Sequence, residues 1–207
     1  MKKEYVIIGI IILIIVIGGI VMFWSKSNQK TNDTNNEDNK YSKGTHHAEI
    51  VIKDYGTMQL ELYADIAPIT VANFAKLAEE GFYDGLTFHR IISGFMIQGG
   101  DPNGNGTGGS KDYIKGEFLA NGVENTISHT RGTISMARSS SYNSARSQFF
   151  IMHEDNEGLD GLYAAFGRVT SGIEIVDQIC SKAQPTDNNG TILKENQPII
   201  ESIKMID

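Results

Sequence analysis

An arginine among apolar residues is the most informative chemical feature of the sequence. Arg90 lies in the stretch FHRIISGFMIQGGD, residues 88–101. Alternation in a strand places residues two apart on one face, which predicts that Phe88, Arg90 and Ile92 point the same way. A guanidinium is costly to bury among apolar groups without a partner. Arg90 therefore either pairs with a local acceptor or contacts a ligand.

Two interpretations of Arg90 are open at this point. Its stem can cover apolar surface while its head reaches water, which is common for arginine. Three features favour a ligand instead: the nearby amide of Gln98, the pair Phe95 and Met96, and a second segment of the same mixed character at residues 132–153, GTISMARSSSYNSARSQFFIMH.

Other motifs do not indicate a cofactor or a metal. Gly104, Gly106 and Gly109 fit G-x-G-x-x-G, but no strand precedes them and no helical pattern follows, so a loop with positive φ angles is the better interpretation. His46 and His47 are adjacent, without a third placed ligand. The sequence therefore predicts neither a cofactor nor a metal site.

The elements that must position these residues are mostly short strands. Runs with alternating apolar residues cover 48–53, 58–63 and 198–206. Helical spacing begins at Pro68 and stops before Gly81, and a second helical pattern begins near Gly172. Many short strands with only two helices indicate a mainly β fold, either an antiparallel barrel or a sandwich.

The N-terminus has a different composition. Residues 6–24 are uncharged and mostly apolar, and a helix of this length spans roughly 28 Å, close to the hydrocarbon thickness of about 30 Å. The run lacks the small-residue cleavage site of a secretory signal peptide. We expect one transmembrane helix within residues 1–24 that anchors the chain to a membrane, with Trp24 at the interface.

Orientation follows from the flanking charges. Lys2, Lys3 and the α-amino group precede the run, whereas Lys26 and Lys30 follow it. This distribution favours a cytoplasmic N-terminus and places the rest of the single-pass protein outside the membrane.

The remaining chain divides into a tether and one domain. Residues 25–45 are rich in Asn, Lys, Asp, Thr and Ser, which predicts a disordered linker. Residues 46–207 have the length of one domain. The formal net charge of −7 gives no electrostatic basis for binding nucleic acid.

Four blocks within residues 46–207 closely resemble the cyclophilin family of peptidyl-prolyl isomerases. The blocks are FHRIISGFMIQGGD, GTISMA, SQFFIM and LDGLYAAFGRV, and they occur in the family's order and spacing. The resemblance implies a closed eight-stranded antiparallel β-barrel capped by two α-helices. It also implies peptidyl-prolyl cis-trans isomerase activity on proline-containing polypeptides.

The resemblance also assigns roles to residues. Arg90 matches the family's catalytic arginine, and Gln98 is expected to orient it and to contact the substrate carbonyl. The apolar residues of the set are expected to line the proline pocket, residues 137–139 to run beside the peptide, and Gln148 to border an adjacent pocket. The expected substrate-binding residues are Phe95, Met96, Gln98, Ala137, Arg138, Ser139, Gln148, Phe150, Leu159 and Tyr163.

The sequence departs from the best-known family pattern at four positions. Arg138 stands where many members have Asn, Ser139 where they have Ala, and Tyr163 where His is frequent. Gly158 stands where drug-sensitive members have Trp. Since an indole supplies both apolar area and a hydrogen-bond donor, its absence predicts weak binding of cyclosporin.

Two functions from different classes are compatible with these residues. The first is a membrane-anchored isomerase that acts on unfolded or newly exported proteins. The second is a chaperone or assembly module that binds proline segments, with incidental turnover. The presence of Arg90 together with Gln98 favours the first, because a pure binding module needs the pocket but no donor aimed at the imide nitrogen.

Overall fold

The first two strands form the hairpin that the alternating sequence predicts. The computed structural model describes residues 40–207. Strand β1 (Thr45–Ile52) pairs antiparallel with β2 (Gly56–Tyr63), and buried positions alternate with more accessible ones along both. The turn between them requires left-handed backbone at Asp54 (φ 65°) and Gly56 (φ 116°).

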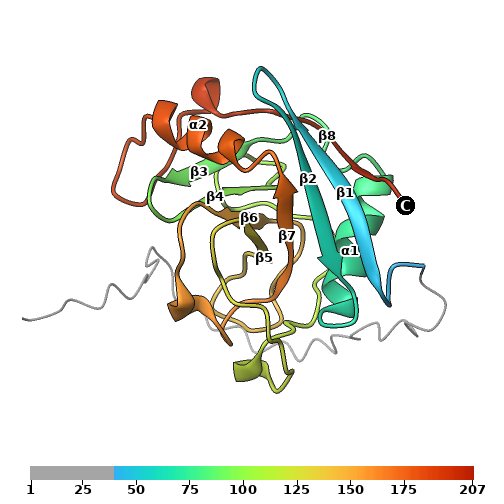
Figure 1. Ribbon diagram of the computed structural model, residues 1–207. Coiled ribbons are helices and arrows are strands. Elements are labelled where there is room, and N and C mark those ends of the chain that lie inside the picture. Colours follow the sequence, from blue (N-terminus) through green and yellow to red (C-terminus); the bar gives the residue numbers. More distant parts are fainter. Residues whose placement is uncertain (1–39) are drawn as a thin grey trace, which may run out of the picture. The chain divides into compact units, whose positions relative to one another are not determined.

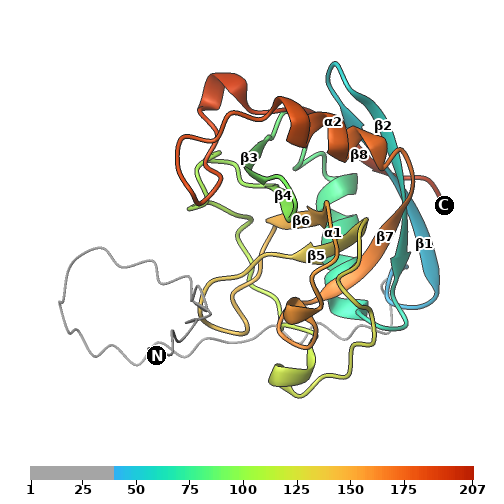
Figure 2. The ribbon, with the colours of Figure 1, turned by 60° about the vertical axis from the view of Figure 1, so that its left-hand side comes forward.

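Eight strands make one antiparallel sheet that curls around a core (Figures 1 and 2). Its order is β3-β4-β6-β5-β7-β2-β1-β8. The six later strands are β3 (Phe88–Ile92), β4 (Met96–Gly99), β5 (Thr133–Met136), β6 (Phe149–Met152), β7 (Ala165–Ser171) and β8 (Ile200–Met205).

The two edges of the sheet meet without forming a continuous ladder. Thr87 and Ile199, which precede β3 and β8, form an isolated antiparallel bridge, and the Ile200 N–H donates to the Leu86 carbonyl at 2.8 Å. The predicted eight-stranded antiparallel fold with two helices is therefore confirmed, and isolated contacts bring its edge strands together.

The two helices lie near opposite ends of the β1–β2 hairpin (Figures 1 and 2). Helix α1 (Pro68–Glu79) begins with Pro68 in its first turn, and Gly81 follows its C-cap with φ 67°, as predicted. Helix α2 (Glu174–Lys182) lies near the hairpin turn. Residues 40–207 also contain three short 3-10 turns: Leu119–Asn121, Glu157–Leu159 and Lys194–Asn196.

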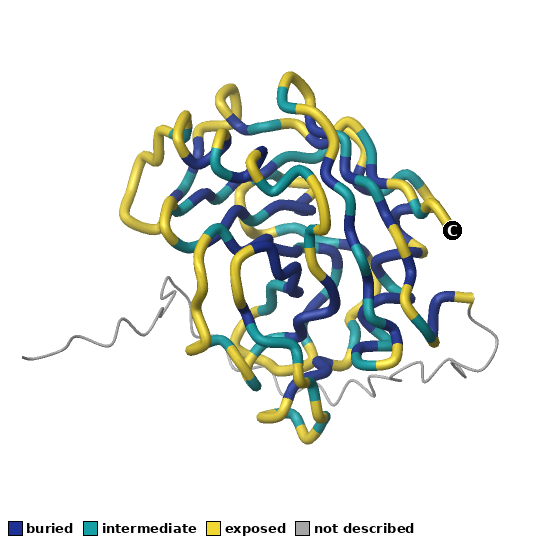
Figure 3. The backbone as a smooth tube through the Cα atoms, in the orientation of Figure 1, coloured by how far each residue is buried: buried dark blue, intermediate teal, exposed yellow. Residues whose placement is uncertain are grey.

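The main core combines the inner face of the sheet with α1. Phe74 of α1 contacts the rings of Tyr83, Phe149 and Phe166 at centroid distances of 5.2 to 5.6 Å. Figure 3 shows buried positions along the strands and α1, while the connecting loops are largely exposed. A second, smaller cluster of buried residues, Met96, Phe150 and Met152, lies apart from this core.

The folded part of the described chain includes residues before the expected boundary at His46. Tyr41 is only 3% exposed, and its hydroxyl donates to Glu79 at 2.6 Å. Residues 40–45, expected in the linker, therefore belong to the folded part. The expected membrane span and residues 25–39 of the linker lie outside the described residues. Within residues 40–207, no helix has the length and apolar character needed to cross a membrane.

Candidate active site

A β-bulge determines which way Arg90 faces. Phe88 pairs with Gly99, but Arg90 pairs with Gln98, so His89 is an extra residue in β3. The bulge changes the alternation, and Phe88 consequently lies in the main core at 0% exposure while Arg90 is only partly buried. The prediction that Phe88 and Arg90 share a face is wrong for this reason.

Two acceptors fix the guanidinium of Arg90. Its Nε donates to the Asn189 carbonyl at 2.7 Å, and its Nη1 donates to Oε1 of Gln98 at 3.1 Å. Nη1 also lies 3.9 Å from the Met96 sulfur. Nη2 makes no hydrogen bond within residues 40–207, so one end of the rigid fork stays available to a ligand.

Burial lowers the pKa of the Arg90 guanidinium from its usual value, and nearby Tyr163 and Asp187 oppose that shift. An arginine keeps its proton in proteins even when its pKa falls, because its intrinsic pKa is so high. Arg90 is therefore a fixed, partly desolvated cation, and it acts more strongly on a nearby lone pair than an exposed cation would.

A chain of amides holds Gln98 in turn. Nε2 of Gln98 donates to Oε1 of Gln148 at 2.9 Å, and Nε2 of Gln148 donates to the Gly108 carbonyl at 2.8 Å. The structure therefore joins two predicted site residues that are fifty positions apart. This chain also links Arg90 to the glycine-rich loop.

The glycine-rich loop is a turn structure, as its sequence predicts. The carboxylate of buried Asp101 accepts hydrogen bonds from the N–H groups of Asn103, Asn105 and Gly106. Gly104 and Gly106 have φ angles of 64° and 87°, which explains these two glycines without a nucleotide site. Gly109 has no positive φ angle; a Cβ there would lie 2.6 Å from Nε of Arg146.

A cluster of apolar side chains lies beside Arg90, whose Nη1 is 3.9 Å from the Met96 sulfur. Phe150 and Tyr163 pack edge to face with ring centroids 5.9 Å apart. Around the buried cluster of Met96, Phe150 and Met152 pack five partly buried side chains, namely Ile92, Phe95, Ala137, Leu159 and Tyr163. All of the apolar residues predicted for the proline pocket are thus brought together.

The segment after β5 offers free backbone groups beside this apolar cluster. The Ala137 N–H donates to the Gln148 carbonyl, and the Ser139 N–H donates to Oγ of Ser144. The N–H and C=O of Arg138 have no hydrogen-bond partner among the described residues. Arg138 is therefore the position of this segment at which an extended peptide can pair with the backbone.

Sequence reasoning missed four contributors to the site. Ile92 and Met152 have the correct alternation to face the pocket but were assigned no role. Asn189 acts through its carbonyl, which no side-chain pattern reveals. His129 stacks behind Phe150 with centroids 5.9 Å apart and an interplanar angle of 18°.

His129 is itself held in place. Its Nδ1 lies 2.8 Å from Oδ1 of Asp160, and its Nε2 lies 3.0 Å from Oγ of Ser135. Burial lowers the pKa of His129, although Asp160 opposes the shift. This Ser-His-Asp arrangement cannot act as a nucleophilic triad on a substrate, because Ser135 is 0% exposed.

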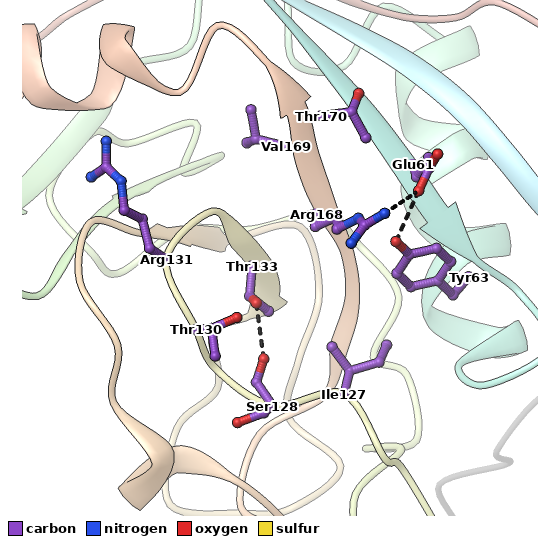
Figure 4. Close-up of a pocket in the computed structure, with 10 residues that line it drawn as sticks. All are labelled: Glu61, Tyr63, Ile127, Ser128, Thr130, Arg131, Thr133, Arg168, Val169 and Thr170. Atoms are coloured by element: carbon purple, nitrogen blue, oxygen red, sulfur yellow. Dashed lines mark hydrogen bonds and ion pairs between the residues drawn. The ribbon is translucent and has the colours of Figure 1, made fainter.

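A polar cavity of about 670 Å³ lies elsewhere, between β2, β7 and the segment before β5 (Figure 4). It contains none of the predicted site residues. Both arginines that line it form salt bridges. Nη2 of Arg168 lies 3.2 Å from Oε2 of Glu61, and Nη2 of Arg131 lies 2.8 Å from Oδ2 of Asp177. The features suited to proline chemistry are at Arg90 instead.

A solved cyclophilin shares this fold. A crystal structure of a Cryptosporidium parvum cyclophilin type peptidyl-prolyl cis-trans isomerase, in the presence of the dipeptide Ala-Pro, aligns with a TM-score of 0.68 and 31% identity. The alignment covers 78% of this chain and 99% of that one. The fold and the site thus define a cyclophilin-like isomerase.

Sequence comparison identifies the family. Residues 47–205 match the family described as cyclophilin type peptidyl-prolyl cis-trans isomerase/CLD. Peptidyl-prolyl cis-trans isomerase B of Bacillus subtilis is 46% identical over 145 residues, covering 70% of this chain and 92% of that protein. A Synechococcus elongatus peptidyl-prolyl cis-trans isomerase is 49% identical over 119 residues, covering 58% of this chain and 77% of that protein. The chain belongs to the cyclophilin family and is a peptidyl-prolyl cis-trans isomerase.

Proposed function

We propose that the chain accelerates rotation about Xaa-Pro bonds by seating proline against Phe150 and stabilising the twisted imide with Arg90. One observation carries this proposal: Arg90 is fixed by Gln98 and Asn189 beside the apolar cluster, yet its Nη2 stays an unused donor within residues 40–207. A site that only bound proline would need the pocket but not this donor.

The chemistry explains why a fixed cation is effective. Amide resonance opposes rotation with a barrier of about 18–20 kcal/mol. In the twisted state the imide nitrogen becomes pyramidal and gains a lone pair, so a donor aimed at that nitrogen stabilises the twisted state more than either planar isomer. No bond forms or breaks, and no cofactor is required.

The remaining site residues hold the substrate. Gln98 orients Arg90 and contacts the substrate carbonyl, while Phe95, Met96, Leu159 and Tyr163 surround the proline ring. The peptide backbone pairs with Arg138, between Ala137 and Ser139, and Gln148 borders the neighbouring pocket. The free N–H and C=O of Arg138 support this arrangement, as does the Ala-Pro dipeptide named with the related Cryptosporidium structure.

The test compares the full-length chain in detergent micelles with Arg90→Ala, using the cis-to-trans relaxation of a short Xaa-Pro peptide. Removing one preorganised donor should lower kcat/KM by about 100- to 1000-fold. Arg168→Ala is the matched control, since Arg168 is paired with Glu61 in the distant polar cavity. Peptide binding without acceleration would contradict the proposal and make the chain a proline-binding chaperone or assembly module.

We propose in addition that the chain is a single-pass membrane protein whose domain acts outside the membrane on unfolded or newly exported polypeptides. The uncharged run at residues 6–24 and the lysines before it support this location. Protease added to spheroplasts that express the full chain should degrade the domain. Protection of the domain until the membrane is dissolved would contradict the orientation.

Weak cyclosporin binding is part of the same proposal. Gly158 is exposed and presents no side chain at the edge of the pocket next to Leu159. Its φ angle lies outside the left-handed range, and a Cβ added there would lie 3.1 Å from Oδ1 of Asn156, so a larger residue requires only a small shift of that side chain. Gly158→Trp should therefore tighten cyclosporin binding at least tenfold. Tight binding by the unaltered protein would contradict the prediction, and Gly158→Ala is the control.

A further inference from the structure

Exposed apolar side chains gather beside the proline pocket. Leu119 is 69% exposed, and Tyr142 and Leu162 are each 41% exposed. The Ala120 N–H donates to the Gly161 carbonyl at 2.9 Å, which joins the 3-10 turn carrying Leu119 to the loop carrying Leu162. We call Leu119, Tyr142 and Leu162 the apolar ledge.

Arg138 fixes the ledge from within. Its Nε and Nη2 both donate to the Leu162 carbonyl, at 3.0 and 2.8 Å, and its Nη1 donates to the Ser139 carbonyl at 3.0 Å. Its guanidinium carbon lies 5.0 Å from the ring centroid of Tyr142 and 5.1 Å from that of buried Phe118. These contacts hold three separate loops in one arrangement before any ligand binds.

The ledge continues directly from the proline pocket through one shared side chain. Tyr163 packs against Phe150 on the pocket side, and its ring centroid lies 4.6 Å from the Arg138 guanidinium carbon on the ledge side. The Cα atoms of consecutive residues in a peptide are only about 3.8 Å apart. A side chain next to a bound proline therefore reaches the ledge when the peptide pairs with the free backbone groups of Arg138.

We infer that the apolar ledge is a specificity subsite of the isomerase, which takes a bulky apolar or aromatic side chain flanking the proline. The inference rests on the proposed function of the Arg90 pocket. The ledge suits an apolar side chain because its own surface is apolar. The Arg138 guanidinium beneath it already donates to the carbonyl groups of Leu162 and Ser139, so it is not a free partner for an acidic side chain. A flat ring also stacks favourably against tyrosine and arginine.

The experiment measures kcat/KM of the full-length chain for Xaa-Pro-Yaa peptides. Phe, Ala or Glu is placed either before or after the proline. We expect a preference of roughly tenfold for Phe over Ala at one of these two positions. Leu119→Ser should reduce that ratio to about threefold or less, with the rate of each variant on the Ala peptide as its own reference.

Ile206→Ser is the matched control, because Ile206 is a 52% exposed aliphatic residue just beyond β8, and it should keep the ratio of the unaltered protein. Arg138→Lys should also reduce the ratio, since lysine keeps the charge but cannot form the fork that bridges Leu162 and Ser139.

Several results would overturn the inference. Equal rates for Phe and Ala at both positions would show that the ledge reads no side chain, and a preference for Glu would assign recognition to the charge of Arg138. An unchanged preference in Leu119→Ser together with a smaller assembly in solution would assign the ledge to self-association. Absence of acceleration for every peptide would instead refute the proposed function of the pocket.

Discussion

At the scale of single residues, the geometry of the Arg90 guanidinium matters more than its charge. One of its two anchors is near in the chain, Gln98 on the neighbouring strand β4, and the other is distant, the carbonyl of Asn189 in the loop after α2. A planar fork can satisfy both anchors and still present a third nitrogen. A lysine carries its donors on a single nitrogen, so it cannot reach both anchors and also present a separate donor to the substrate.

Arg90→Lys should therefore lower kcat/KM by about 100-fold, although the charge is kept. The loss should fall mainly on kcat, since the apolar pocket that binds proline is unchanged. Peptide relaxation over a range of substrate concentrations measures both parameters, and Arg168→Lys is the control. A variant with more than half of the original kcat would show that charge alone is sufficient.

Residue identity predicted part of this site and backbone geometry supplied the rest. Arg90, Gln98, Phe95 and Phe150 were expected to lie together, and their side chains do so. The bulge at His89 has no signal in the local alternation, because an extra residue in a strand leaves the sequence pattern intact. The Asn189 carbonyl was unpredictable because any residue type supplies a carbonyl.

At the scale of elements, helix α1 has an N-terminal cap supplied from a distant segment. Ala67 precedes the helix and provides no side-chain cap. Glu117, which is 2% exposed, accepts hydrogen bonds from the N–H groups of Ile69 and Thr70 at 3.0 and 2.8 Å, and from Oγ1 of Thr70. A carboxylate there also complements the positive end of the helix dipole.

Glu117→Ala should lower the free energy of unfolding by about 2–3 kcal/mol, because it leaves buried N–H groups without an acceptor. Glu117→Gln should cost less, since its amide oxygen still accepts one bond. Urea unfolding measures both changes. Glu124→Ala, at an exposed position in the following loop, is the control; equal losses in the two Ala variants would contradict the capping role.

The sequence pattern predicted the elements better than their partners. The hairpin, both helices and the final strand follow from alternation, helical spacing and turn residues. The cap from Glu117 and the burial of Tyr41 could not be predicted, because each depends on a contact with a segment dozens of residues away. Tyr41 in particular is the only aromatic residue in an otherwise polar stretch.

At the scale of the whole molecule, two buried histidines link stability to pH. His89 is 4% exposed, and neither of its ring nitrogens has a hydrogen-bond partner in the described part of the chain; His129 is 0% exposed. Burial lowers the pKa of both imidazoles. Since the unfolded chain keeps a histidine pKa near 6.5, it binds more protons than the folded domain below that pH.

The free energy of unfolding should therefore decrease as the pH falls below about 6.5, by at most about 1.4 kcal/mol per pH unit for each histidine. Urea unfolding at pH 7.5 and 5.5 measures the change. His89→Leu should reduce the pH dependence of the free energy of unfolding, because it removes a titrating group. The substitution breaks no hydrogen bond of the described residues, since neither ring nitrogen of His89 makes one there. His47→Leu, at an exposed position, is the control. An equal change of the unfolding free energy with pH in the unaltered protein, His89→Leu and His47→Leu would contradict the prediction.

The meeting of β1 and β8 has a consequence for biosynthesis. β1 pairs with β2 and also with β8, and the Asp207 carboxylate accepts the His47 N–H at 2.7 Å. β1, the earliest strand among the described residues, thus cannot complete its pairing until β8 is synthesised about 150 residues later, and such distant pairing is slow. During synthesis this folding catalyst is itself an unfolded polypeptide, with the edge of β1 open to other chains until translation has passed β8.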